Sequence, residues 1–224
     1  MLVSGMITPF GFTGGGFPGA AGTCGATIPA GGNCDIEVIF LPTVAGVFSD
    51  DIEVVYNNGA LLDTKLRTIT GTAVTPADLV ISSSPTFDFG TVAIGASSNT
   101  ILTVTNNGGF MASAILDGGG LVAPFAFNGA FPGAGGNCLG TLAPAASCNI
   151  DVTFTPGGPG LFTDDVDISY NNGLVGANSI RQLSGRGATP ANLVFADAPA
   201  YSYGTKATGS ISSYVFRLVI NYGV

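Results

Sequence analysis

The stretch FPGAAGTCGATIPAGGNCDIEVIFLP at residues 17–42 returns as FPGAGGNCLGTLAPAASCNIDVTFTP at residues 131–156. The offset of 114 residues carries Cys24 to Cys138 and Cys34 to Cys148. It also carries FSDDIEVVYNNG from residues 48–59 to FTDDVDISYNNG at 162–173, and TPADLV from 75–80 to TPANLV at 189–194. A fixed offset of this length indicates tandem domains rather than short solenoid units. We therefore predict a tandem array with a period of about 114 residues.

Within each repeat, apolar and polar residues alternate. NIDVTF at residues 149–154 alternates in this way, as do DIEVVY at 51–56 and DVDISY at 165–170. Such alternation predicts strands with one buried face. Asn-Gly, Gly-Gly and Pro-Gly pairs separate these runs, and no segment keeps a helical period. We predict an all-β fold of tandem immunoglobulin-like sandwiches, a domain type of about 100 residues.

The repeat divides the chain into three parts. Residues 1–74 correspond to the C-terminal part of a repeat, 75–188 to a complete repeat, and 189–224 to the N-terminal part of a further one. The two incomplete parts together come close to one period. We expect the split repeat to be completed, either within a continuous array or by a neighbouring copy through strand donation. In the second case Leu193, Phe216, Leu218 and Ile220 would enter a core formed by Ile36, Val38, Phe40, Ile52 and Val54.

Composition excludes several classes of partner. Charged residues make up 9% of the chain, against about 25% in an average soluble protein. The net charge is −8 with no basic cluster, which argues against nucleic acid and against anionic membrane surfaces. No run approaches the roughly 20 apolar residues of a membrane-spanning helix, and the first residues do not resemble a signal peptide.

The chain has no histidine, which removes the commonest general base and metal ligand. Without it no Ser-His-Asp or Cys-His set is possible, and neither GxSxG nor GxxxxGK occurs. We predict that the protein is not an enzyme and that it binds no cofactor.

Both cysteine pairs have the spacing C-x9-C, without the CxxC spacing or histidines of a zinc site. We expect local disulfides, Cys24 to Cys34 and Cys138 to Cys148; the alternative is free buried thiols. Disulfides in each repeat predict an oxidising compartment, and so an extracellular or cell-surface location.

Two further features recur in both repeats. Asp50, Asp51 and Glu53 return as Asp164, Asp165 and Asp167, which would suit either Ca²⁺ or a solvated strand that discourages aggregation. We favour the solvated strand and assign no metal. Phenylalanines also precede the first cysteine of each pair, and we expect them to form an exposed contact surface rather than a plug of their own core. They are Phe10, Phe12 and Phe17, then Phe125, Phe127 and Phe131.

The complete repeat resembles a known family. The motifs are FDFGTVAIG at Phe87, LTVTNNG at Leu102, the C-x9-C unit at Cys138, FTP at Phe154 and LSGRG at Leu183. In this order they resemble the choice-of-anchor D and Hydin-type (ASH/MSP-like) immunoglobulin-like repeats of bacterial surface proteins. The resemblance implies a seven-stranded sandwich that acts as a spacer, stalk or adhesive module, with no active site in the module.

These observations predict a structural repeat unit of an extracellular fibre, stalk or adhesin, whose partners are other copies of itself or neighbouring repeats. Growth by head-to-tail completion of split sandwiches is one form of this prediction. The alternative is a ligand- or carbohydrate-binding adhesive module that uses the phenylalanine-rich loops.

Overall fold

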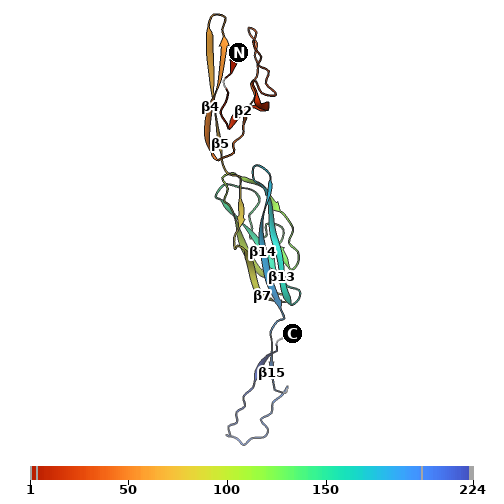
Figure 1. The fold of residues 1–224 in the computed structure, drawn as a ribbon. Coiled ribbons are helices and arrows are strands. Elements are labelled where there is room, and N and C mark those ends of the chain that lie inside the picture. Colours follow the sequence, from red (N-terminus) through yellow and green to blue (C-terminus); the bar gives the residue numbers. More distant parts are fainter. Residues whose placement is uncertain (1, 4, 198, 222–224) are drawn as a thin grey trace. The chain divides into compact units, whose positions relative to one another are not determined.

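The chain forms two compact units, Met1–Pro76 and Ala77–Val224. A computed structural model describes residues 2–3, 5–197 and 199–221 (Figure 1). We call residues 1–76 the N-terminal unit, residues 77–188 the central sandwich and residues 189–221 the C-terminal segment. Apart from a 3-10 turn at Thr13–Gly15, the regular elements of the described residues are strands, which confirms the all-β prediction.

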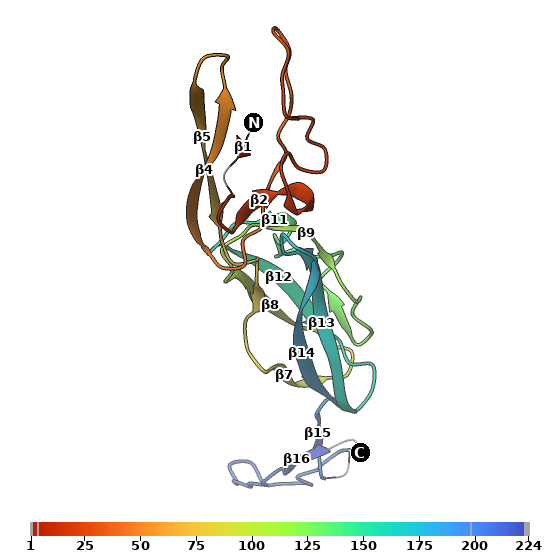
Figure 2. The same ribbon diagram turned by 45° about the horizontal axis from the view of Figure 1, so that its top comes forward.

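The central sandwich consists of two sheets. The first has the order β10 (Phe125–Phe127), β12 (Ser147–Phe154), β8 (Ser98–Asn106) and β6 (Leu79–Ile81). The second has the order β11 (Gly140–Leu142), β9 (Ala112–Asp117), β13 (Gly160–Asn171), β14 (Gly176–Ala188) and β7 (Thr86–Ala93). All pairings are antiparallel except that of β7 with β14. Figure 2 shows β12 and β8 in a different layer from β13 and β14.

The core lies between these sheets and follows the alternation in the sequence. In β12 the residues Ile150, Val152 and Phe154 are fully buried, and in β13 Val166 and Ile168 are too. Strands β6 and β8 complete the same cluster with Leu79, Ile81, Leu102 and Val104. Burying an aliphatic or aromatic side chain of this kind contributes about 1.5–3 kcal/mol, so this cluster is the main source of the domain's stability.

The sandwich has nine strands, which corrects the expected seven. The additional pairing comes from short segments at the sheet edges. Strand β10 pairs with β12, and β11 pairs with β9, each over three residues. Both segments lie in or beside the Gly-rich stretch around Cys138, where the residue pattern is too short to predict a strand.

The N-terminal unit repeats part of this architecture. It contains β1 (Leu2–Val3), β2 (Phe10–Phe12), β3 (Val38–Phe40), β4 (Gly46–Asn57) and β5 (Leu62–Ala73). Strand β4 pairs with β1 and β5, and β2 pairs with β3. The registers match those of the central sandwich: Ile52 pairs with Arg67, as Val166 pairs with Arg181.

A glycine against an aromatic ring also recurs. A Cβ at Gly185 would lie 2.7 Å from the ring of Phe154, and a Cβ at Gly71 would lie 2.7 Å from the ring of Phe40. In both units the ring packs closely against a glycine of the opposite hairpin, where a side chain would not fit. The N-terminal unit therefore has the local packing of the central sandwich wherever the corresponding strands are present.

The C-terminal segment contains β15 (Asn192–Phe195) and β16 (Leu218–Asn221), paired antiparallel. Leu193 pairs with Ile220 and Phe195 with Leu218. In the central sandwich Leu79 pairs with Asn106 and Ile81 with Val104, which are the same positions 114 residues earlier. The segment therefore has the same strand pairing and register as β6 and β8.

Candidate assembly site

One face of the N-terminal unit is only half-buried although its residues are those of a core. We call it the open face and define it by Ile36, Val38, Phe40, Ile52 and Val54. Their counterparts 114 residues later are the β12 and β13 core residues, all 0% exposed. In the central sandwich β6, β7 and β8 lie over or beside these positions. Among the described residues of the N-terminal unit, no strand corresponds to those three.

The edge of β3 is open in the same way. In the central sandwich, β12 pairs with β8 along all eight of its residues, from Ser147 to Phe154. The corresponding strand of the N-terminal unit, β3, has only three residues and pairs with β2 alone. An unpaired strand edge is a template for another strand.

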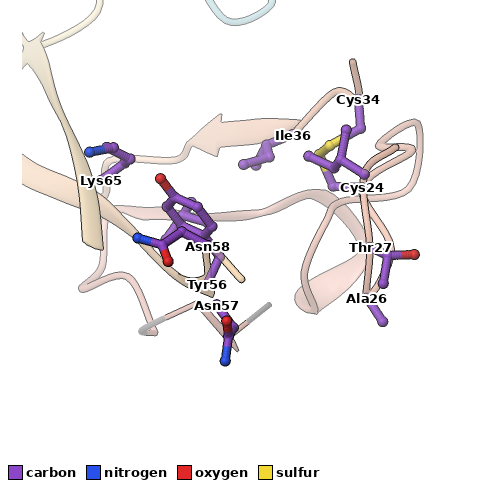
Figure 3. A pocket seen from close by; sticks show the side chains of 11 residues that line it. Cys24, Ala26, Thr27, Cys34, Ile36, Tyr56, Asn57, Asn58 and Lys65 are labelled. Atoms are coloured by element: carbon purple, nitrogen blue, oxygen red, sulfur yellow. A yellow bond between two sulfur atoms is a disulfide. The ribbon is translucent and has the colours of Figure 1, made fainter. Parts of the chain in front are cut away.

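A pocket of about 700 Å³ lies beside the open face. Figure 3 shows the Cys24–Cys34 disulfide and Ile36 on one side of it, and Tyr56, Asn58 and Lys65 on the other. In the central sandwich the counterpart of Tyr56 is Tyr170, whose hydroxyl accepts a hydrogen bond from the Leu79 backbone N–H at 3.2 Å. In the central sandwich, β6 therefore begins at the position that corresponds to the pocket of the N-terminal unit.

The polar wall of this pocket is a small network. The Tyr56 hydroxyl donates to an Asp63 carboxylate oxygen at 2.8 Å, and the Lys65 Nζ lies 3.0 Å from the same oxygen. The hydrogen bond to Asp63 raises the pKa of Tyr56. The pKa of Asp63 is lowered, first by the hydrogen bond from Tyr56 and then by that from Lys65. The hydroxyl of Tyr56 therefore donates to Asp63 and keeps its lone pairs for an N–H donor.

Strand β5 presents an arginine whose counterpart is buried. Arg181 is 8% exposed, and its guanidinium donates to the backbone carbonyls of Ile81, Ser82 and Pro85. Two of these contacts, Nε to Ser82 and Nη1 to Pro85, are 2.9 Å. The counterpart of Arg181 in the N-terminal unit is Arg67, which is exposed.

The C-terminal segment exposes apolar side chains at positions that are core positions in the complete repeat. Leu193 is 59% exposed and Leu218 is 52% exposed, whereas their counterparts Leu79 and Val104 are buried. Phe195 and Phe216 share this property, and Ile220 is also exposed, although its counterpart is the buried polar residue Asn106.

Charge differs in sign between the two surfaces. Residues 1–74 contain six carboxylates and two cationic side chains, while residues 189–224 contain one carboxylate, Asp197, and two cations, Lys206 and Arg217. Complementary charge favours encounter between such surfaces.

The disulfides agree with the sequence prediction. Cys24 is bonded to Cys34 and Cys138 to Cys148, and the described residues contain no free cysteine. These bonds indicate an oxidising environment.

No helix in the described part of the chain has the length and apolar character needed to span a membrane.

The expectation of an exposed aromatic surface is wrong for Phe125 and Phe127. Strand β10 carries both into the core, where they are 1% and 8% exposed. Phe125 stacks on Phe154 with ring centroids 4.8 Å apart, and Phe127 packs edge-on against half-buried Phe131 at 5.1 Å. The counterpart Phe10 is buried as well. These rings complete their own core, which was the less favoured interpretation.

The acidic strand residues serve local structure. Asp164 accepts a hydrogen bond from the Val122 N–H at 2.7 Å, and Asp50 accepts one from the Ile7 N–H at 2.7 Å. Both of these bonds tie a preceding loop to the strand. Among the residues that the structure describes, no group of three acidic or cysteine side chains is placed to hold a metal ion.

Sequence reasoning singled out the apolar members of the open face but gave no separate role to Tyr56 or Arg67. The signal was present, because Tyr56 and Arg67 recur as Tyr170 and Arg181 at the same offset. Their significance depends on contacts across the sandwich, which the offset alone does not give.

The two packed sheets define an immunoglobulin-like β-sandwich. Residues 80–185 match the family model described as HYDIN/CFA65/VesB-like, Ig-like domain, so the central sandwich is similar to the domains of that family. No curated protein matches the chain.

Several solved structures are similar. One is the ASH/PapD-like domain 7 of human CEP192, with 17% identity, a TM-score of 0.38, and coverage of 55% of this chain and 92% of that one. Another is the Vibrio cholerae VesB protease, with 15% identity, a TM-score of 0.38, and coverage of 50% and 32%. A protein of unknown function from Porphyromonas gingivalis W83 has 10% identity, a TM-score of 0.35, and coverage of 65% and 70%. The chain spans about a third of VesB, and at these scores the likenesses carry no argument about function.

Proposed function

We propose that this chain is a structural repeat unit of an extracellular fibre, stalk or adhesin, and that copies join head to tail by completing split sandwiches. The C-terminal segment of one copy supplies the strands that the open face of the next copy lacks. The role is mechanical or adhesive and involves no catalysis. Its partners are other copies of the same chain, outside the cell or at the cell surface.

The observation that carries the proposal is the contrast between equivalent residues. The β12 and β13 core is fully buried in the central sandwich, whereas the open face, 114 residues earlier, is half-buried. An apolar face of this kind next to an unpaired strand edge is costly in water and prone to association. The C-terminal segment carries matching apolar residues in the β6–β8 register.

Strand addition also explains how the joint would be specific. In β-augmentation the backbone hydrogen bonds supply affinity, and the side-chain pockets supply selectivity. By the central register, Phe216 of the incoming copy lies opposite Ile36, as Leu102 lies opposite Ile150. A contact between two different surfaces of the same molecule does not close on itself, so it produces a linear assembly.

Substitution of Leu218 by Asp tests the proposal. An aspartate at this position would place an unpaired charge in the completed core, which is strongly unfavourable. We expect L218D to lose concentration-dependent self-association, followed by sedimentation velocity and electron microscopy, while its central sandwich remains folded.

The matched control is Val219→Asp. Val219 is the next residue of β16, and its counterpart Thr105 lies on the outer face, where its hydroxyl bonds that of Ser147. We expect V219D to associate nearly as the wild type does. Wild-type chains that remain monomeric at every accessible concentration, or filaments of undiminished length after deletion of residues 189–224, would refute head-to-tail strand donation.

A further inference from the structure

We infer that Arg67 and Tyr56 are the polar anchors that set the register of the incoming strand, with Arg67 binding backbone carbonyls of the second copy. This inference rests on the proposed function and specifies its recognition chemistry. The segment that would bind here is residues 191–201 of a second copy. The alternating strand pattern alone would assign Arg67 to the sheet surface and Tyr56 to the core.

The first step of the argument is the template inside the chain. Arg181 reaches from β14 in one sheet to the end of β6 in the other, where it holds three carbonyls within five residues of chain. These carbonyls belong to the last residue of β6 and to the segment that connects it to β7. Arg181 thereby fixes the point at which the chain leaves one sheet and crosses to the other.

The second step is that the strand register around the arginine is the same in both hairpins of this chain. Arg67 pairs with Ile52 in β5–β4 as Arg181 pairs with Val166 in β14–β13. The Arg67 side chain therefore leaves the β4–β5 hairpin at the position from which Arg181 leaves the β13–β14 hairpin. The carbonyls at the corresponding positions of a further repeat belong to Phe195, Ala196 and Pro199. Pro199 is the counterpart of Pro85 at the 114-residue offset.

The third step concerns the other end of the strand. Tyr170 accepts the N–H of Leu79, and Tyr56 occupies the same position at the edge of the 700 Å³ pocket. The corresponding N–H is that of Leu193, and the pocket beside Tyr56 is where Leu193 and its neighbours would lie. Arg67 and Tyr56 thus contact the incoming strand at its end and at its beginning, respectively.

This arrangement fixes register, which the apolar contacts do not. A slip of one residue would turn the apolar residues of β15 to the wrong face, and a slip of two would preserve the alternation. A two-residue slip would, however, move the carbonyls away from Arg67 and the N–H away from Tyr56. Hydrogen bonds to a guanidinium are stronger than neutral ones, and its planar fork reaches several acceptors at once.

The experiment measures self-association of the full-length chain by sedimentation velocity for the wild type, Arg67→Ala and Arg67→Lys. We expect R67A to weaken association at least about tenfold, the factor that corresponds to losing one charged hydrogen bond. We expect R67K to recover less than half of that loss in free energy, because an ammonium does not reproduce the fork. Tyr56→Phe should weaken association by a smaller factor.

The matched control is Arg186→Ala. It removes one positive charge from an exposed position on β14, and we expect its association to stay within about twofold of wild type. The Cys24–Cys34 disulfide, checked by peptide mapping, and the monomer sedimentation coefficient report whether the N-terminal unit of each variant is intact. If R67A fails this check, R67K decides the question.

The outcomes separate the two proposals. If the wild type does not associate, the proposed function fails. If the wild type associates, L218D does not, and R67A and R67K associate as the wild type does, then strand donation stands and the anchor role of Arg67 is wrong. A loss in R186A equal to that in R67A would show a general charge effect and would also overturn the anchor role.

Discussion

Asn106 shows how a single polar residue organises the turn region of the central sandwich. It is 0% exposed and makes four hydrogen bonds through its side chain. Its Oδ1 accepts from the N–H groups of Asp78 and Gly108, and its Nδ2 donates to the carbonyls of Phe110 and Leu142. One amide side chain thus satisfies backbone groups from three separate segments, which is the full capacity of an asparagine.

Replacing Asn106 by Ala should leave several of these backbone groups without partners. Each unsatisfied buried group costs about 1–3 kcal/mol, so we expect a loss of at least about 3 kcal/mol in the free energy of unfolding of the central sandwich. Urea denaturation followed by tyrosine fluorescence measures it. The control is Asn107→Ala, because the Asn107 side chain is exposed and its hydrogen bond to Asp78 comes from the backbone. Equal losses in the two variants would contradict the role given to Asn106.

At the level of elements, the Cys138–Cys148 disulfide links β12 of the first sheet to the segment that leads into β11 at the edge of the second sheet. Cys148 lies at the beginning of β12, and Cys138 precedes β11 in the opposite sheet. The sequence separation is 10 in both repeats. Both central cysteines are buried, so the bond is part of the core and also restricts the unfolded chain.

Double substitution of Cys138 and Cys148 by Ala should destabilise the central sandwich without unfolding it. Closing a loop of this length contributes about 2–3 kcal/mol through chain entropy, which is less than the contribution of the apolar cluster. We expect a lower thermal midpoint and an unchanged β-sheet circular dichroism spectrum. Mass spectrometry of the wild type should find two bonds within repeats, and a peptide linking Cys24 to Cys148 would contradict the local pairing.

At the scale of the whole molecule, the proposed joint connects two different surfaces. Each copy would therefore offer one donor segment and one acceptor face, and growth would continue until one of the two is missing. A copy that lacks only the donor function can still accept a strand and then blocks the next addition.

Mixing L218D chains into wild type should accordingly shorten the assemblies. We expect the mean filament length by electron microscopy to fall steadily as the fraction of L218D rises, even at substoichiometric amounts. V219D, mixed in the same proportions, should leave the length unchanged. If L218D dilutes the sample without shortening filaments, association does not proceed through a single donor and a single acceptor surface.

Residue order alone predicts the all-β class, the 114-residue offset and the local pairing of the cysteines. It also predicts which residues of β12 and β13 point inward. These properties are local or periodic: side-chain alternation follows from the strand geometry, and recurrence of a motif at a fixed distance needs no knowledge of contacts.

Whether an inward-pointing residue is covered depends on contacts between strands that are distant in the sequence. Val38 and Val152 have the same residue type and the same place in the repeat, yet Val152 is fully buried and Val38 is half-buried. Likewise, the sequence predicts Phe125 and Phe127 to lie in a loop, whereas in the structure β10 pairs with β12 and both rings are buried in the core. Burial depends on strands that are distant in sequence, β8 beside β12 and β7 beside β14, and a local pattern carries no information about whether such neighbours are present.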